Sequence, residues 1–400
     1  MIVIYGAAGT TGTLVARELF GRGHRVVLSG RDRSRLERLA SSLAGHRPGV
    51  ADAAEPGGRP ETRPAQVHDA AEMAAAMRGA RVVVACAGPF LQVGEAALRA
   101  ALEAGAHYID VCGEQAFLRE AYERFDSPAR RAGVTAVPGF AWEIALGDWA
   151  ASRAAALCRA QVAPAGRAAD GGERGEPAAG ALAPVDEIAI GYALSQVSTT
   201  PGTRQSLVAA LSQPISVWLE DRWERVAPLS RTRSIAFPPP FGEREALLWP
   251  SGEVITVPRH APARRVEAYL SAGGGAPALR AAARLAGLVG PLVSVAAASP
   301  LGAFVRARAG AGPPPDEAAR RSIEFAIVAE ASLHFRRARV SLGGTDPYAQ
   351  SARIAALGVE RLLGAGPPFP AGVIAPSQLV SPEGSLAALV GEGWLSLAEN

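Results

Sequence analysis

The chain has 400 residues, 48% of them hydrophobic and 20% charged, so it is long enough for two or three domains that each bury a core. This composition excludes a disordered tail, a fibre and a small domain held together by disulfides. The 41 basic and 38 acidic residues leave a net charge of +3, too small a surplus to predict nucleic-acid binding.

Strand and helix patterns alternate over the first 150 residues. The predicted strands lie at 2–5, 25–29, 66–68, 82–85, 107–111 and 135–137, and the helices include 11–21, 34–43 and 94–104. Because parallel strands need crossover helices, this order predicts an α/β domain with a Rossmann-like, doubly wound parallel sheet over 1–150. The chain opens directly on a strand pattern without a secretory signal, so a cytoplasmic location is expected.

The pattern changes after residue 150. We expect an α+β substrate domain over 151–345 with a mainly antiparallel sheet, containing a flexible Ala/Gly/Pro-rich insertion at 163–184. Its predicted strands lie at 186–194, 231–237, 253–258, 265–271, 322–330 and 338–342. Residues 346–400 carry helical patterns and are expected to return to the first domain.

An uncharged stretch at 285–305 is long enough to cross a bilayer, but Pro291 and Pro300 interrupt it. A buried or interface-lying helical pair and an apolar wall of a substrate site are the preferred interpretations. Peripheral contact with a membrane stays open as an alternative.

The strongest motif is a glycine-rich turn between the first strand and the first helix. Its spacing provides a sharp turn, close approach of a pyrophosphate, and tight packing of helix on strand, with the helix N-terminus facing the phosphates. A strand before it and a helix after it are the context that supports dinucleotide binding. The residues expected to contact the cofactor here are Gly6, Ala7, Gly9, Thr10, Thr11 and Gly12.

The tip of the second strand predicts which dinucleotide is bound. Ser29, Gly30 and Arg31 stand where NAD enzymes carry an acid for the ribose 2′-hydroxyl. An arginine suits the 2′-phosphate of NADP(H), so NADPH is favoured over NADH. Asp32 leaves the alternative open, because it can serve as the ribose acid if the strand ends one residue later.

Further cofactor contacts are expected where the other strands end, because ligands of doubly wound sheets lie at this edge. Asp69 is equally well explained as a helix cap. The candidate residues at these strand ends are Asp69, Ala87, Gly88, Pro89, Cys112, Gly113 and Phe140.

Several kinds of chemistry are excluded by the residues that are missing. The sequence contains no lysine, which excludes a Schiff-base lysine, a Walker A lysine and the Tyr-x-x-x-Lys acid of short-chain dehydrogenases. Cys86, Cys112 and Cys158 form no CxxC pair, so neither a disulfide framework nor a zinc site is predicted, and no metal is expected.

Taken together, these motifs resemble the saccharopine dehydrogenase-like NADP-binding proteins. The matching segments are GAAGTTG near the start, SGRDRSRL after the second strand and ACAGPFLQVGEAALRAALEAGAHYIDVCGE over 85–114. The segments GGTDPYAQSARIAALGVERLL and PAGVIAPSQLV near the carboxyl end resemble the branch with trans-acting enoyl reductases and saccharopine-dehydrogenase-like oxidoreductases. The chain departs from the family after the sixth strand, where GFAWEIALGD lacks the family's proline and first aspartate.

The resemblance implies an NADPH-dependent oxidoreductase that transfers a hydride to the activated C=C bond of an enoyl thioester, polyketide or lipid chain. It implies an apolar or carrier-bound acyl substrate and a homodimer. Candidate donors to the developing oxyanion are Tyr108, Glu114 and Trp142. Tyr108 lies inside a strand, where a core position is the preferred alternative, and Glu114 is equally well explained as the cap of the next helix. Imine or ketone reduction in specialised metabolism is an alternative, and a non-catalytic NADP-binding sensor or scaffold is an alternative of another class.

Overall fold

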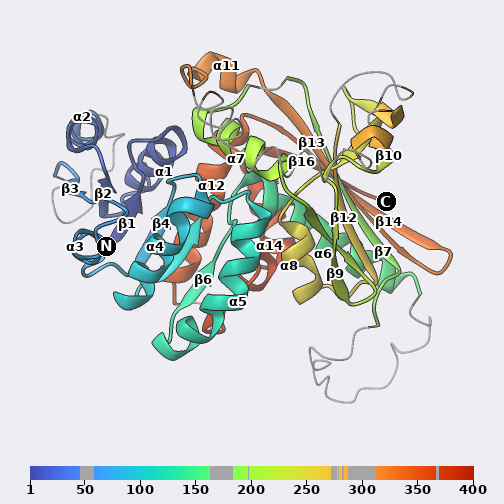
Figure 1. Cartoon of the computed structure of the whole chain (residues 1–400), viewed down its shortest axis with the longest axis horizontal. Helices are drawn as coiled ribbons and strands as arrows, with labels where there is room; N and C mark the ends of the chain where they lie inside the picture. Colours follow the sequence, from blue (N-terminus) through green and yellow to red (C-terminus); the bar gives the residue numbers. More distant parts are fainter. Residues whose placement is uncertain are drawn as a thin grey trace.

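A computed structural model describes residues 1–45, 58–162, 183–196, 198–271, 311–365 and 369–400, with a few more positions between 277 and 308. Two β-sheets organise this part of the chain (Figure 1). The amino-terminal sheet with its helices occupies the left and centre of the view, and the second sheet lies to the right.

The first sheet is parallel throughout its described strands, with the order β15-β6-β5-β4-β1-β2-β3. This confirms the predicted Rossmann-like, doubly wound architecture, and the reversal of strand order at β1 places a ligand crevice there. The strands are β1 Ile2–Tyr5, β2 Val26–Gly30, β3 Glu61–Pro64, β4 Val82–Ala85, β5 His107–Asp110, β6 Thr135–Val137 and β15 Gly372–Val373.

Alternate residues of each strand point to opposite faces of this sheet, and helices cover both faces. Ile2 and Ile4 of β1 belong to one core, with α1 (Thr10–Gly21), α2 (Arg33–Ala44) and α12 (Pro347–Leu363). Val3 and Tyr5 belong to the other. The helices that contribute to that second core are α3 (Ala70–Met77), α4 (Phe90–Glu103) and α5 (Gln115–Ala132).

The second sheet is mainly antiparallel, as predicted, with the order β10-β11-β12-β7-β13-β14-β16 and with β8 and β9 attached through β12. Its one parallel pair among the described strands is β12 with β7. The strands are β7 Glu187–Leu194, β8 Ile215–Leu219, β9 Arg222–Val226, β10 Thr232–Phe237, β11 Gly242–Leu248, β12 Arg265–Ser271, β13 Glu324–Leu333, β14 Arg336–Thr345 and β16 Leu395–Glu399.

Helix α6 (Trp142–Ala160) joins the two sheets and is almost entirely buried. It packs on β13 and β14 of the second sheet and also on α12, which covers the first. The expected domain boundary at residue 150 therefore falls inside a helix that both sheets share. The remaining helices are α7 Pro201–Leu211, α8 Glu253–Thr256, α11 Glu317–Arg321, α13 Pro376–Leu379 and α14 Pro382–Gly391.

The carboxyl-terminal segment contributes to both sheets. Its helix α12 packs on α1, β15 adds an edge strand to the first sheet, and α13 and α14 pack on α6. The last described strand, β16, pairs with β14 of the second sheet.

Two predicted strands are wrong. The third strand lies at Glu61–Pro64 rather than 66–68, because it is a polar edge strand whose side chains are only partly covered and give no apolar signal. The β-branched run at 253–258 forms the helix α8 and a short 3₁₀ turn, Val257–Arg259, since the packing of this segment overrides its strand propensity.

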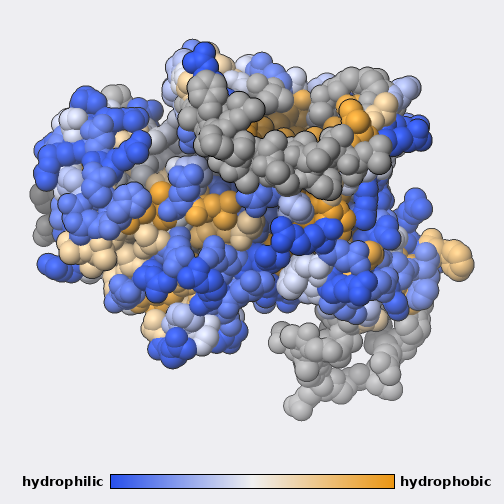
Figure 2. Space-filling view, in the orientation of Figure 1, coloured by the Kyte–Doolittle hydropathy of each residue, from blue (hydrophilic) through white to orange (hydrophobic). Residues whose placement is uncertain are grey.

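Two expected features lie almost wholly outside the described residues: the insertion at 163–184 and the apolar stretch at 285–305. Within the described part of the chain, no helix is both long and apolar enough to cross a membrane. Figure 2 shows that apolar side chains reach the surface along the middle of this face, whereas the surface of the amino-terminal domain is mostly hydrophilic.

Candidate active site

The glycine-rich turn between β1 and α1 has the geometry of a phosphate cradle. Gly6 has a φ of +82°, which favours glycine, and a Cβ on Gly12 would lie 2.2 Å from the Gly6 carbonyl oxygen. No side chain caps α1, whose N-cap is Gly9, so the N–H groups of its first turn, including those of Thr10 and Thr11, remain available to a ligand. These residues fit the pyrophosphate of a dinucleotide at a helix N-terminus.

Hydrogen bonds hold this turn in place. The N–H groups of Gly6 and Ala7 donate to the Ser29 carbonyl at 2.9 and 3.0 Å, so buried Ser29 supports the turn through its backbone. The Arg35 guanidinium donates to the Ala8 carbonyl at 2.7 Å. Arg35 is not among the residues predicted from the sequence, because its position within α2 gives no sign of this contact.

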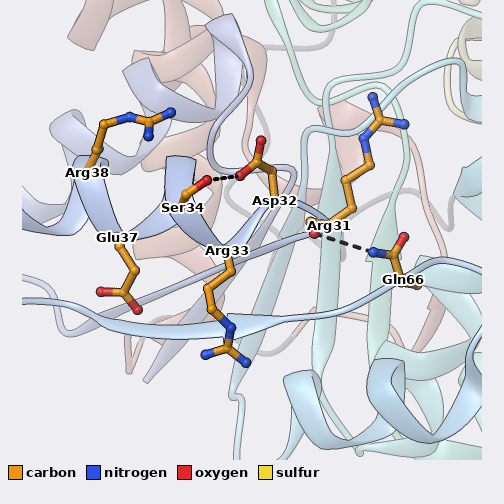
Figure 3. A pocket seen from close by; sticks show the side chains of 7 residues that line it. All are labelled: Arg31, Asp32, Arg33, Ser34, Glu37, Arg38 and Gln66. Atoms are coloured by element: carbon orange, nitrogen blue, oxygen red, sulfur yellow. Dashed lines mark hydrogen bonds between the residues drawn. The ribbon is translucent and has the colours of Figure 1, made fainter.

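A shallow cavity of about 920 Å³ lies beyond the tip of β2, where the adenosine end of a dinucleotide belongs (Figure 3). Three arginines from this tip and from α2 outnumber the acids Asp32 and Glu37, so the lining has a small positive surplus, which suits a 2′-phosphate. Only Arg31 of the three was predicted. The lining residues are Arg31, Asp32, Arg33, Ser34, Glu37, Arg38 and Gln66.

Asp32 is committed to capping α2. Its carboxylate accepts hydrogen bonds from the Arg35 N–H at 3.0 Å and from the Ser34 hydroxyl at 2.8 Å, and these bonds hold the pKa of Asp32 below its usual range. Gly30 before it has a φ of +152° and lies against Gly6, which joins the strand tip to the phosphate turn. The geometry therefore favours a cap over the ribose-binding role left open by the sequence.

Other predicted cofactor contacts follow the end of β4 or precede the start of α3. A Cβ on Gly6 would lie 2.6 Å from the Ala87 nitrogen, so Ala87 packs directly against the turn, and Gly88 lines the cleft described below. Pro89 is the N-cap of α4 and follows a cis peptide bond. Asp69 caps α3 by accepting from the N–H groups of Ala71 and Glu72, so its carboxylate is already occupied.

A cleft of about 310 Å³ lies between the two sheets, at the carboxyl ends of β4 and β5. Helix α7, strands β7 and β12 and the start of α12 close its other side. Its described lining is mostly apolar or hydroxyl-bearing, and its charged members are the two carboxylic acids Glu114 and Glu143. Lining residues include Thr11, Cys86, Phe90, Cys112, Gly113, Trp142, Ile144, Tyr192, Leu194, Thr200, Thr203, Ser206, Leu207, Trp249, Leu270, Ile323, Tyr348 and Ser351.

Asp110, at the end of β5, organises the floor of this region from within the core. It is fully buried, and its Oδ1 atom accepts hydrogen bonds from the Cys112 N–H at 2.9 Å and the Gly139 N–H at 2.7 Å. Burial raises the pKa of Asp110 to about 7, although those two hydrogen bonds act in the opposite direction. Asp110 therefore fixes the two loops that carry Gly113 and the start of α6.

Glu114 lies at the cleft, but its carboxylate is engaged. It accepts from the N–H groups of Phe90 and Leu91 at 2.7 and 3.0 Å, which caps α4, and from the Ser206 hydroxyl of α7 at 2.6 Å. Three hydrogen bonds hold this carboxylate as an acceptor, so it is a connector between α4 and α7 rather than the free donor that the sequence suggested.

Two predicted contacts lie in the core. Tyr108 is fully buried within β5 and does not line the cleft, because alternation along the strand points it into the α3–α5 side. Phe140 is also fully buried, with its ring 5.7 Å from that of Trp149. Trp142, in contrast, lines the cleft beside Tyr192, although its indole Nε1 has no partner among the described residues.

Glu143 follows Trp142 in the first turn of α6 and faces the same cleft. Its Oε1 atom accepts hydrogen bonds from the Trp249 indole at 3.3 Å and the Ser251 hydroxyl at 3.1 Å. Burial raises the pKa of Glu143, and these two hydrogen bonds oppose that shift. The helix dipole favours an acid in the first turn of any helix, so the position of Glu143 in the sequence has a purely structural explanation. Its contacts with Trp249 and Ser251 of the second domain cannot be predicted from the sequence.

Comparison with known proteins identifies the first domain. Residues 2–137 match the family described as the saccharopine dehydrogenase NADP-binding domain. The match covers about a third of the chain and makes this segment similar to the NADP-binding domain of saccharopine dehydrogenases. Together with the arginine-lined cavity at the tip of β2, it indicates NADP(H) as the cofactor.

Related proteins extend this similarity. A lipid droplet localized protein of Caenorhabditis elegans is 28% identical over 148 residues, which cover 36% of this chain and 33% of that protein. A Mycobacterium tuberculosis protein, whose name assigns it to the trans-acting enoyl reductases, is 30% identical over 141 residues, covering 34% of this chain and 30% of its own. The chain thus matches about a third of the length of these relatives, in line with the extent of the NADP-binding domain.

The fold is shared over a longer range than the sequence. The structure of apo saccharopine dehydrogenase (L-Glu forming) from Saccharomyces cerevisiae superposes with a TM-score of 0.61, covering 100% of this chain and 99% of that one. Sequence identity is 10%, so this likeness concerns the fold alone. The NADP-binding domain and the second sheet therefore form an architecture already known in that enzyme.

Proposed function

We propose that this protein is an NADPH-dependent oxidoreductase that reduces the activated C=C bond of an apolar acyl substrate. The observation that carries the proposal is the mostly apolar cleft of about 310 Å³ next to Cys86 and Gly113, at the edge where the nicotinamide half of the dinucleotide belongs. When bound, NADPH would supply the hydride.

The charges of the cleft favour a neutral substrate. Its ionisable side chains of Asp, Glu, His or Arg in the described part of the chain are Glu114 and Glu143, so it offers no basic side chain to pair with a substrate carboxylate. Apolar side chains such as Phe90, Leu207 and Leu270 suit an acyl chain. This lining supports an enoyl thioester, free or carried by a protein, over an amino-acid substrate.

A second candidate is the reduction of a ketone or imine, which Glu143 favours. Such a reduction leaves negative charge or a lone pair on oxygen or nitrogen, and a nearby carboxylic acid can protonate it. The raised pKa of Glu143 keeps more of its acid form near neutral pH than an ordinary glutamate would have.

A panel of three probes tests both candidates. The protein is mixed with NADPH labelled with deuterium at C4 and with an octenoyl thioester of N-acetylcysteamine, a medium-chain methyl ketone or a cyclic imine. We expect NADPH oxidation with the enoyl thioester, and deuterium at its β-carbon by mass spectrometry. Oxidation with the ketone or imine alone would replace the first candidate by the second. Tight NADPH binding without turnover of any probe would indicate a sensor or scaffold.

A further inference from the structure

A half-buried carboxyl group, a buried hydroxyl and a buried carboxyl group form a connected line that begins at the cleft. Glu143 stands at the cleft end, Ser251 follows and Glu253 lies innermost. The Ser251 hydroxyl oxygen is 3.1 Å from Oε1 of Glu143 and also within hydrogen-bonding distance of Oε2 of Glu253. Ser251 and Glu253 have no solvent exposure, so bulk water does not take part in these contacts.

The number of protons shared by these three groups determines which of them donates each hydrogen bond. A serine hydroxyl has one proton and cannot donate to both carboxyl groups at once. The other Glu253 oxygen, Oε1, is buried without a partner, a poor environment for a negative charge. Glu253 is therefore the neutral acid that donates to Ser251, and Ser251 donates to Glu143. Burial, together with the charge of Glu143, raises the pKa of Glu253 well above its ordinary value, in agreement with this arrangement.

The outer end of the line meets the reacting edge of the cofactor domain. Only Oε1 of Glu143 accepts hydrogen bonds from the described residues, so Oε2 is left for a substrate. A Cβ on Gly113 would lie 3.1 Å from this Oε2 atom, so the carboxyl borders the loop after β5, beside the expected nicotinamide position.

The line is held rigidly by its surroundings. Gln115 donates a hydrogen bond to the Ser251 carbonyl at 3.0 Å. Tyr192 donates to the Glu143 carbonyl at 2.8 Å, and Gly147 leaves the space in which the Glu253 carboxyl lies, since a Cβ there would be 2.1 Å from Oε1 of Glu253. The other titratable groups that face it are Cys112 and Glu114 after β5, Tyr192 of β7, and Asp148 of α6 with its partner His260.

We propose that Glu143 is the catalytic acid of this cleft and that Ser251 and Glu253 form a buried relay that returns a proton to it. The inference rests on the proposed reductase function and assigns its proton donor. As the substrate carbon accepts the hydride, the electron pair of the double bond moves to its other atom. In the reactive form Glu143 is protonated at Oε2, gives this proton to that atom and becomes a carboxylate. Glu253 then passes its proton to Ser251, and Ser251 passes its own to Glu143. On product release a solvent proton enters at Glu143, which lines the cleft, and the line returns one proton to the buried Glu253.

Infrared difference spectroscopy tests the relay without substrate. At mildly alkaline pH, where Asp110 is ionised, the wild-type protein should show the carbonyl band of a protonated, buried carboxyl, and Glu253→Gln should remove it. Ser251→Ala should shift this band, because the acid loses its acceptor, whereas Ser251→Thr should leave it in place. Spectra that are the same for wild type, Glu253→Gln and Ser251→Ala would overturn the relay.

Kinetics test the assignment of Glu143. On whichever panel probe is reduced, Glu143→Gln should lower kcat about 100-fold or more while NADPH affinity is retained. Because Glu143 acts in its acid form, wild-type kcat should fall as the pH rises through its raised pKa, and this limb should be absent in Glu143→Gln. An unchanged kcat or pH profile in this variant would overturn the assignment.

Glu253→Gln separates a relay from a structural role. The amide can still donate to Ser251 but has no proton to transfer, so we expect a first turnover of about one NADPH per protein molecule followed by a slow steady state. Equal slowing of the first turnover and the steady state would indicate a structural effect and overturn the relay. A relay seen by infrared in a protein that reduces no panel probe would contradict the proposed function instead, so the two failures are distinguishable.

Discussion

At the scale of single residues, Arg31 and Asp32 show how neighbouring side chains divide their roles. Asp32 is engaged in capping α2, whereas the Arg31 side chain lines the open cavity at the end of β2. Recognition of the 2′-phosphate by Arg31 stays a prediction, and Arg33 and Arg38 line the same cavity.

Arg31→Ala should weaken NADPH binding about 10- to 150-fold, the loss of a charged hydrogen bond of about 1.5–3 kcal/mol. NADH affinity should change little, because NADH lacks the phosphate. Calorimetric titration with both cofactors measures the difference. Arg17→Ala, on the exposed side of α1, is the matched control and should leave both affinities unchanged. Equal losses for NADPH and NADH would remove Arg31 from phosphate recognition.

Asp110 leads to a prediction about stability and pH. Its pKa in the folded protein, about 7, lies above its ordinary value of 3.8, so the native state binds the proton more tightly. Stability from this group is complete below the ordinary pKa and is lost as the pH rises through about 7. Asp110→Asn stays neutral and keeps an oxygen to accept from Cys112 and Gly139.

The free energy of unfolding of Asp110→Asn should therefore rise relative to wild type between mildly acidic and mildly alkaline pH. The burial of this group makes the change on the order of 1–4 kcal/mol. Urea titrations of both proteins across this range measure it. Parallel stability curves for the two proteins would contradict the raised pKa.

These residues also show what the sequence could and could not predict. The phosphate turn and Arg31 were predictable because consecutive residues define them. Glu143 and Asp110 gain their roles from groups far away in the chain, such as Trp249 and Gly139. The core position of Tyr108 was the preferred alternative, but a tyrosine near a strand end looks the same in sequence whether it faces the cleft or the core, so the donor role also stayed open.

At the scale of elements, α1 contains two glycines with different surroundings, and the turn before the helix depends on one of them. A Cβ on Gly12 would lie 2.2 Å from the Gly6 carbonyl, whereas a Cβ on Gly21, at the far end of α1, would meet nothing within 4 Å. The two glycines therefore form a matched pair within one helix.

Gly12→Ala should destabilise the protein by about 1–3 kcal/mol, because the methyl group must displace the backbone of the turn. NADPH binding should be lost with it. Gly21→Ala should keep cofactor binding and raise stability by about 0.5–1 kcal/mol, since alanine is the better helix former. Thermal unfolding and cofactor titration measure both effects. Intact NADPH binding in Gly12→Ala would contradict the cradle.

Helices and strands with a clear periodicity were predicted well, and those dominated by packing were not. β7 and α12 lie close to their predicted ranges. The segment at 253–258 is rich in β-branched residues, yet it folds as α8 because Val254, Ile255 and Val257 pack into separate parts of the core.

At the scale of the whole molecule, Gln115 connects the two sheets. At the start of α5 its side chain donates to the Ser216 carbonyl at 2.9 Å and the Ser251 carbonyl at 3.0 Å, and accepts from the Ser216 N–H at 2.7 Å. All three backbone groups belong to the second domain. The side-chain amide of Gln115 thus forms hydrogen bonds with three backbone groups of the second domain.

Gln115→Ala should lower the free energy of unfolding by about 1–3 kcal/mol for each backbone group that stays buried without a partner. Gln161→Ala removes a hydrogen bond of an exposed glutamine to the Arg337 carbonyl and should cost little. Urea denaturation followed by tryptophan fluorescence compares the two variants. Equal, small effects would show that the connection between the sheets does not depend on Gln115.

The chain order of the first sheet has a consequence for protein synthesis. Thr135 of β6 donates a hydrogen bond to the Pro370 carbonyl, 235 residues later, and β15 and α12 complete the edge and the cover of the same sheet. The residues of the phosphate cradle are therefore synthesised early, whereas α12 and β15, which cover and extend the same sheet, are synthesised much later. Until then the apolar side chains of the nucleotide-binding half that pack on α12 have no cover.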